Sequence, residues 1–143
     1  MTKSATSKKV RAIGGVFFRA NNPAETREWY AKHLGLETDP YGTNFAWRHK
    51  DEPEKAGYTQ WSPFDGDTEY FGHVDQQFMI NYRVDDLDGL LASLQENGVE
   101  IVGEVVQESF GRFIHIIDNE GRRVELWEPI DDEYEKILDG VTK

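Results

Sequence analysis

An internal repeat is the feature of this sequence that most constrains its fold. Two segments share one order of elements: an apolar run, a polar turn, a helical stretch, a glycine and a second apolar run. The first segment begins at Ile13 and the second begins at Phe78. Matching residues recur at offsets of 63 or 64: Arg19 with Arg83, and Gly35 with Gly98. Because such repetition fixes the architecture of a chain, we expect two copies of one supersecondary unit.

A helix is predicted after the first apolar run of each copy. Asn22 and Asp86 are suited to cap the two helices, and Pro23 and Glu25 fit the first turn of the first helix. One face of each helix is set by residues at helical spacing, which are Thr26, Trp29, Tyr30 and His33 in the first and Leu87, Leu90, Leu91 and Leu94 in the second. Both helices end at a glycine, the residue that most easily adopts the left-handed C-terminal conformation.

Strands are predicted around each helix, so that each copy has the order β-α-β-β-β. In the first copy they are 13–20, a short strand from Leu36, 44–48 and 57–62, and in the second they are 78–84, 99–102, 112–117 and 123–128. We therefore divide the chain into a flexible tail over 1–11, one domain over 12–129, and a tail or short helix over 130–143. Within the domain, the first module spans 12–64, a linker spans 65–77 and the second module spans 78–129.

Strand alternation predicts that one face of the sheet is mixed in character, with both aromatic and polar side chains. This face carries Gly15, Phe17, Arg19, Tyr58, Gln60, Ser62, Met79, Asn81, Arg83, Phe113, His115, Ile117, Arg123, Glu125 and Trp127. The opposite face is apolar and should lie under the helices. A curved sheet that encloses a ligand explains the mixed face, since ligand cavities are apolar with a few placed polar groups. A second apolar interface, such as a dimer contact, is the alternative.

Composition excludes several classes of function. The formal net charge is −11, which repels nucleic acids and anionic membranes. No apolar run approaches the roughly 20 residues that span a bilayer. The absence of cysteine excludes disulfides and thiolate metal sites. The charge and the absence of a long apolar run therefore predict no nucleic-acid or membrane partner. Since no apolar signal core follows the basic N-terminal residues, we expect a cytoplasmic protein.

Two motifs mark the beginning and the end of the repeated region. The opening motif is Ile13-Gly-Gly-Val-Phe-Phe-Arg, followed by Trp29-Tyr30 and Leu34-Gly35-Leu36. The closing motif is Asp118-Asn-Glu-Gly-Arg-Arg-Val-Glu-Leu-Trp-Glu-Pro129. Together they resemble the vicinal oxygen chelate superfamily, which includes glyoxalases, bleomycin-resistance proteins and dioxygenases. The resemblance implies an α+β fold, in which two βαβββ modules form a cupped, barrel-like mixed sheet with helices on the outside, and it implies a homodimer.

The resemblance also locates the positions that hold a metal ion in metal-dependent members of the family. They correspond to Gly15, Gln60, Met79 and Glu125. Only Glu125 is a typical ligand, because glycine has no side chain, an amide is a weak donor and a thioether suits neither hard nor borderline ions. We therefore predict no metal and no other cofactor, with a divalent ion as the disfavoured alternative.

Glu125 and His115 are the candidate catalytic residues. Glu125 lies between apolar neighbours, so it is either a buried general base or a structural carboxylate paired with Arg123 or Arg83. His115 is the one histidine on the predicted cavity face, at a place where the resemblance to fosfomycin-resistance enzymes implies substrate contact. A histidine satisfied within the sheet is the alternative for His115.

The predicted ligand-binding residues include an aromatic box for a flat or cationic molecule. The box comprises Phe17, Trp47, Tyr58, Phe113 and Trp127, and the remaining ligand-binding residues are Gln60, Met79, Asn81 and Arg83. Core packing is the alternative for each ring. The leading hypothesis is a metal-independent protein of the bleomycin-resistance type that binds an aromatic or cationic small molecule. The alternative is a lyase or isomerase in which Glu125 and His115 transfer protons, with or without a divalent metal.

Overall fold

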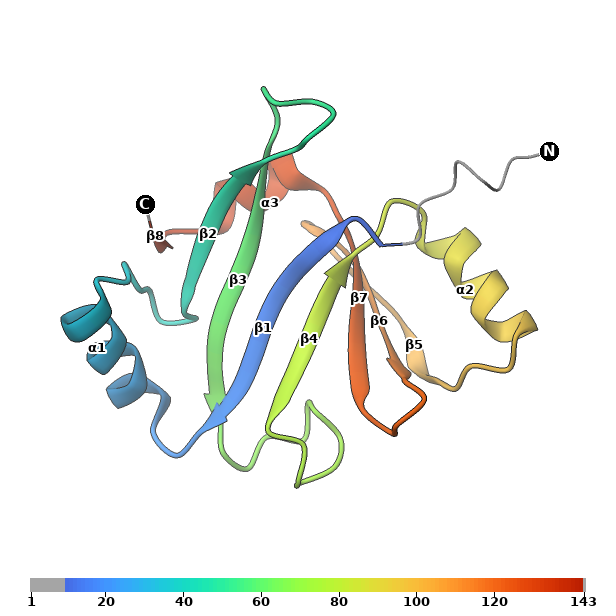
Figure 1. Cartoon of the computed structure of the whole chain (residues 1–143), viewed down its shortest axis with the longest axis horizontal. Helices are drawn as coiled ribbons and strands as arrows, with labels where there is room; N and C mark the ends of the chain where they lie inside the picture. Colours follow the sequence, from blue (N-terminus) through green and yellow to red (C-terminus); the bar gives the residue numbers. More distant parts are fainter. Residues whose placement is uncertain (1–9, 143) are drawn as a thin grey trace.

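The computed structural model describes residues 10–142 as one mixed sheet of eight strands with three helices (Figure 1). The strands are β1 (Ala12–Ala20), β2 (Thr43–Arg48), β3 (Ala56–Asp65), β4 (Phe78–Arg83), β5 (Ile101–Glu108), β6 (Gly111–Ile117), β7 (Arg123–Pro129) and β8 (Val141–Thr142). The helices are α1 (Pro23–Leu34), α2 (Leu87–Glu96) and α3 (Asp131–Ile137). This arrangement confirms the predicted α+β class. Most of the tail expected over 1–11 lies outside the described residues.

The two modules meet at the centre of the sheet. The strand order is β5-β6-β7-β4-β1-β3-β2-β8, and β1 pairs with β4 in antiparallel orientation. Outward from this pair, β1 is parallel to β3 and β4 is parallel to β7. The same pairing pattern therefore repeats on both sides of the β1–β4 seam, as an approximate twofold relation between the modules. The sheet remains open, with β5 and β8 at its edges.

The first module lacks the short strand that was expected from Leu36. The loop at this point forms only an isolated bridge between Asp39 and Gly42. Pro40, which has no backbone N–H to donate, interrupts the run. β8 pairs with β2 instead, and it takes the sheet position that β5 takes in the second module.

The two long helices lie at the two sides of the sheet, α1 beside the first module and α2 beside the second, and they bury apolar side chains to different extents (Figure 1). The Asn22 side chain accepts the backbone N–H of Glu25, as the capping motif predicts. Yet α1 has no fully buried residue, and Trp29 is 53% exposed, so its predicted apolar face is only partly covered. In α2, Leu87 and Leu90 are buried against Val84, Ile114 and Leu126. The second module therefore holds the larger apolar core.

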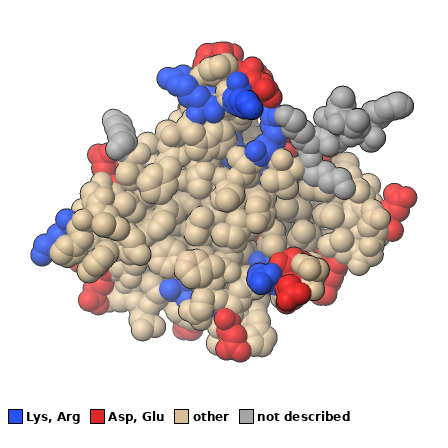
Figure 2. Space-filling model, viewed as in Figure 1, with Lys and Arg blue, Asp and Glu red and all other residues tan. Residues whose placement is uncertain are grey.

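The outer face of the sheet is uncharged over the central strands, and Figure 2 shows charged side chains mainly at its margins. The inner face differs, because α3 lies against it. Tyr134 of α3 is buried beside Tyr58 of β3 and Trp127 of β7. The helix expected after residue 130 therefore exists, and it fills part of the cup. None of the helices among the described residues is long and apolar enough to span a bilayer.

Candidate functional site

A row of side-chain positions crosses the inner face of the sheet where the modules meet. Residues that face each other on adjacent strands lie on the same side of a sheet. Cross-strand pairs link β2, β3, β1, β4, β7 and β6 in the order Asn44, Gln60, Gly15, Asn81, Glu125 and His115. Each module contributes three of these positions. The second module contributes the ionisable ones.

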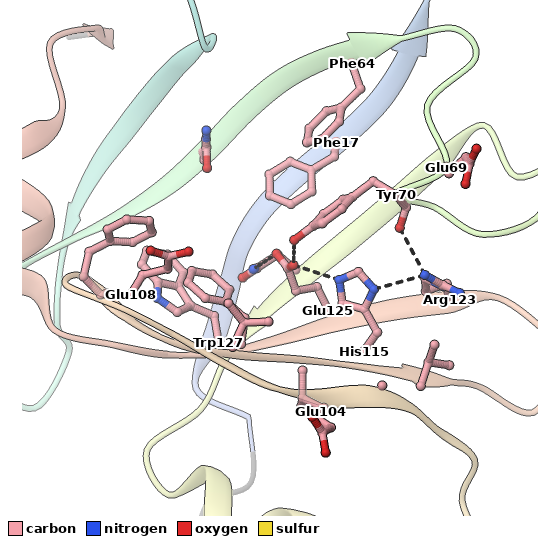
Figure 3. Close-up of a pocket in the computed structure, with 18 of the residues that line it drawn as sticks. Phe17, Phe64, Glu69, Tyr70, Glu104, Glu108, His115, Arg123, Glu125 and Trp127 are labelled. Carbon is pink, nitrogen blue, oxygen red and sulfur yellow. Dashed lines mark hydrogen bonds and ion pairs between the residues drawn. The ribbon is translucent and has the colours of Figure 1, made fainter.

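Glu125 is the centre of a hydrogen-bonded cluster in the second module (Figure 3). Its side chain is only 2% exposed, so its carboxyl oxygens require partners within the protein. Asn81 Nδ2 donates to Oε1 at 2.7 Å, and the Tyr70 hydroxyl donates to Oε2. His115 Nε2 lies 2.9 Å from the same Oε2. Three side chains from β4, β6 and the linker thus converge on one carboxyl group.

The contact made by His115 Nδ1 indicates which role the other ring nitrogen, Nε2, has toward Glu125. Arg123 Nη1 lies 3.5 Å from His115 Nδ1, and a guanidinium only donates. This contact favours the tautomer in which Nδ1 accepts and Nε2 donates to Glu125. Gln76 fixes Arg123 in turn, because its side chain bonds the backbone N–H and the carbonyl of Arg123 at 2.8 and 2.9 Å.

Tyr70 is the functional residue that sequence reasoning missed. It lies in the segment treated as a linker, between β3 and β4, and its phenol points to Glu125 (Figure 3). Burial, followed by the negative charge of Glu125, raises the pKa of Tyr70 well above its ordinary value. The hydroxyl therefore keeps its proton and acts as a donor. The adjacent aromatic pair Tyr70-Phe71 in an otherwise polar linker is a signal that could have indicated a packed segment.

The cluster lies in a pocket with a volume of about 770 Å³. Its aromatic residues are Phe17, Phe64, Tyr70, Phe110, Phe113, Trp127 and Tyr134. Two stacked pairs contribute to these walls, with ring centroids 5.5 Å apart for Phe113–Trp127 and 5.6 Å apart for Phe64–Tyr70. The charged lining residues are Glu69, Glu104, Glu108, Glu125 and Arg123. The pocket is therefore aromatic and, in formal charge, acidic.

Seven of the eleven predicted site residues line this pocket: Glu125, His115, Phe17, Gln60, Asn81, Phe113 and Trp127. The other four lie elsewhere. Met79 is fully buried against Phe17 and Phe71, and Tyr58 packs on Tyr134. Arg83 pairs with Asp131 and lies between the rings of Trp47 and Trp127, so neither it nor Trp47 contributes to the pocket lining.

One wall of the pocket is formed by the hairpin of β5 and β6, whose first strand is longer than expected. The strand predicted over 99–102 begins at Ile101 and continues to Glu108. Val102, Gly103, Glu104, Val106 and Glu108 line the pocket, as does Phe110 in the turn that follows. Sequence patterns did not identify these residues because Gly103 has a positive φ of 76° and the register shifts between Val102 and Val106, which interrupts the alternation.

The donors at the family's metal positions do not fit a divalent ion. Gly15 offers no side chain, and the Met79 thioether is packed among aromatic rings. Both carboxyl oxygens of Glu125 already accept hydrogen bonds. Within residues 10–142, no three His, Asp or Glu side chains gather to hold a metal. A divalent ion needs several inward lone pairs, which this set does not supply.

The comparison with protein families agrees with this geometry. Residues 12–126 match the Glyoxalase/Bleomycin resistance protein/Dioxygenase superfamily. The chain belongs to this superfamily. No match was found among curated proteins.

Several solved structures share the fold of the chain. Methylmalonyl-CoA epimerase from Mycobacterium tuberculosis has a TM-score of 0.60 at 22% identity, covering 94% of this chain and 97% of its own. A Streptomyces coelicolor methylmalonyl-CoA epimerase in complex with 2-nitronate-propionyl-CoA has a TM-score of 0.63 at 16% identity, with coverage of 84% and 98%. A structure described as NAD-dependent benzaldehyde dehydrogenase from Legionella pneumophila has a TM-score of 0.52 at 17% identity, with coverage of 81% and 98%. At these identities the likeness concerns the fold alone.

Proposed function

We propose that this protein binds a small, cationic, aromatic molecule in the pocket beside Glu125, without the help of a metal ion. The observation that carries the proposal is the lining itself, in which seven aromatic side chains accompany four carboxyl groups and one guanidinium. Aromatic faces attract cations, and the surrounding carboxylates add to this attraction. The formal net charge of −11 acts in the same direction at longer range.

The same lining argues against an acyl-CoA ligand of the kind bound by the epimerase structure. Coenzyme A carries several phosphate charges, which would face Glu69, Glu104 and Glu108 at this pocket. The one cationic lining residue, Arg123, contacts His115 and the carbonyl of Tyr70. Anionic ligands would therefore meet repulsion with little compensation.

Calorimetric titration with three probes of one shape tests the proposal. The probes are (naphthalen-2-yl)methylammonium, naphthalen-2-ylmethanol and naphthalene-2-carboxylate. We expect the cation to bind with one site per chain and about tenfold more tightly than the alcohol, since a desolvated cation–π contact contributes up to about 2 kcal/mol. The carboxylate should not bind. Binding of the carboxylate as tightly as the ammonium would overturn the proposal.

Proton transfer is a second candidate function, and the Glu125–His115 contact of 2.9 Å favours it. A carboxylate and an imidazole that share a proton can act as base and acid on a carbonyl compound. Phenacyltrimethylammonium is a suitable probe, because it combines an aromatic ring, a fixed cation and acidic α-protons. We expect the protein to accelerate exchange of these protons in D₂O, as followed by NMR. An equal exchange rate with the Glu125→Gln variant, shown by circular dichroism to be folded, would exclude this function.

A further inference from the structure

Two tyrosines cover the inner face from equivalent places in the repeat. Tyr70 follows the first module and donates to Glu125 of the second module. Tyr134 follows the second module and donates to Asn44 Oδ1 of the first module, at 2.6 Å. The two residues are 64 positions apart, which is the offset of the sequence repeat. Each module thus sends a phenol across the seam to the other module.

The two phenols reach the same row of inner-face positions, although the two residues that they contact are not equivalent in the repeat. Across the β1–β4 seam, Gln60 on β3 has the place of Glu125 on β7, and Asn44 on β2 has the place of His115 on β6. The first module therefore has two amides at the positions where the second module has the carboxyl group and the imidazole. Amides donate and accept hydrogen bonds, but they do not become charged near neutral pH.

A second cavity of about 440 Å³ lies beside the two amides, Asn44 and Gln60. Its lining includes Thr43 and Asn44, and it shares Gln60, Phe110 and Tyr134 with the main pocket. Asp39 also lines it, but backbone N–H groups of Tyr41, Gly42 and Gly140 already bond its carboxyl oxygens. The Gln60 side chain, by contrast, lines both cavities and makes no side-chain hydrogen bond to another residue that the structure describes. An amide group at the junction of two cavities is thus available to a ligand.

We propose that this second cavity is a subsite for a neutral hydrogen-bonding group, such as a primary amide or a hydroxyl. The subsite belongs to the same ligand whose cationic aromatic part occupies the main pocket, so this inference rests on the proposed function. Gln60 bonds the ligand at the junction, and Asn44 defines the neutral end. The carboxyl and imidazole groups define the charged end. The repeat therefore provides one binding surface with two chemically different halves.

Extended probes test the subsite in the full-length chain. One probe is (naphthalen-2-yl)methylammonium with a flexible N-alkyl chain that ends in a primary carboxamide, and the matched probe ends in an isopropyl group of similar size. By calorimetry, we expect the carboxamide probe to bind about five- to tenfold more tightly, which corresponds to about one or two neutral hydrogen bonds. Equal affinities of the two probes would overturn the subsite.

Two matched variants locate the effect. Ile137 lines only the second cavity and is 52% exposed, so Ile137→Trp should fill the cavity and remove the gain from the carboxamide. Ile130 is 45% exposed and lines neither cavity, so Ile130→Trp should keep the gain. The affinity for the simple naphthyl ammonium should be unchanged in both variants. Persistence of the gain in Ile137→Trp would place the carboxamide elsewhere and reject the subsite.

A third measurement separates this inference from the function on which it rests. Butanamide, which has no charge and no ring, is titrated while the side-chain amide resonances of Asn44 and Gln60 are followed by NMR. We expect both resonances to shift. If they shift while the naphthyl ammonium does not bind, the proposed function fails and the neutral site stands. If they do not shift while the ammonium binds, the subsite fails and the proposed function stands.

Discussion

Arg19 and Arg83 anchor corresponding segments of the two modules. The guanidinium of Arg19 donates to four backbone carbonyls of the linker between residues 66 and 76. The guanidinium of Arg83 pairs with Asp131 at the start of α3. Each arginine thereby holds the segment that carries a tyrosine over the inner face. The two arginines position the site without lining it.

We expect Arg19→Gln to release the linker and with it Tyr70. Four carbonyls lose a charged donor, and water replaces only part of this bonding, so the stability should fall by about 2–4 kcal/mol. Hydrogen exchange should accelerate most in the linker amides. Arg112→Gln is the control, because its pair with Asp88 lies at the solvent-exposed surface and should contribute little to stability. Unchanged linker protection in Arg19→Gln would contradict this role.

The Asn81 side chain occupies the space next to Gly14 that a larger residue would fill. A Cβ at Gly14 would lie 2.3 Å from Asn81 Oδ1 and 2.9 Å from Arg83 Cγ, although its φ is not positive. Gly14→Ala should therefore displace Asn81 from Glu125, cost about 1–3 kcal/mol and weaken binding of the naphthyl ammonium. Gly66→Ala, whose Cβ would meet nothing closer than 3.4 Å, should be tolerated. Chemical denaturation and calorimetry give the two measurements.

Glu125→Gln should weaken binding of the naphthyl ammonium by at least about tenfold, because it removes the one buried carboxylate in the pocket. The alcohol probe should bind the variant as it binds the original chain. Glu54→Gln, in the exposed loop between β2 and β3, removes an equal charge far from the pocket lining and should have little effect. A similar loss of affinity in both variants would indicate only a long-range charge effect.

Stability should fall at alkaline pH more steeply than exposed tyrosines would cause. Burial raises the pKa of Tyr134 to about 12, and burial together with a hydrogen bond to Glu135 raises the pKa of Tyr58 to about 12. The unfolded chain ionises these phenols near its ordinary pKa of about 10, whereas the folded chain keeps them neutral. Unfolding therefore releases protons in this range, and the folded state loses stability as the pH rises from about 10 to 12.

Melting temperatures across this pH range check the effect. The Tyr134→Phe variant should be less stable than the original chain at neutral pH, but it should lose less stability between pH 9 and pH 12. Tyr41→Phe is the control, because Tyr41 is highly exposed, and its pH dependence should match that of the original chain. If the melting temperature falls equally with pH in the original chain and in both variants, the buried phenols do not cause the loss of stability at alkaline pH.

Chelation should leave the protein unchanged. Since the donors around Glu125 do not fit a divalent ion, EDTA should alter neither the melting temperature nor the affinity for the naphthyl ammonium. Addition of Zn²⁺, Ni²⁺ or Mn²⁺ should likewise produce no saturable stabilisation. Elemental analysis that finds one metal per chain, lost in Glu125→Ala, would reverse this expectation.

Local sequence patterns predicted most of the fold because the helix caps and the strand alternation are short-range features. The caps at Asn22 and Asp86 are both present, and the predicted inner face of β7 carries Arg123, Glu125 and Trp127 into the pocket. Long-range features escaped prediction. The pairing of β8 with β2 joins residues 96 positions apart or more, and no local pattern signals it.

The site was predicted in part for the same reason. Glu125, His115 and Asn81 share a face that alternation identifies, but Tyr70 and Phe110 lie in connecting segments whose paths depend on tertiary contacts. Trp47 and Arg83 lie outside the lining of this pocket, and an arginine between two aromatic rings is indistinguishable in sequence from one that faces a ligand. The homodimer and the cytoplasmic location implied at the outset stay predictions.

The position of β8 also bears on how the protein is made. The free side of β2 presents unpaired backbone groups until Val141 and Thr142 arrive, and such strand edges recruit other chains. During synthesis the first module therefore emerges with the edge of β2 unpaired. The β8 segment leaves the ribosome only after about one further module has been made. Loss of residues 139–142 would leave the backbone groups of β2 that pair with β8 permanently exposed. β8, the shortest strand of the sheet, therefore reduces pairing of β2 with other chains.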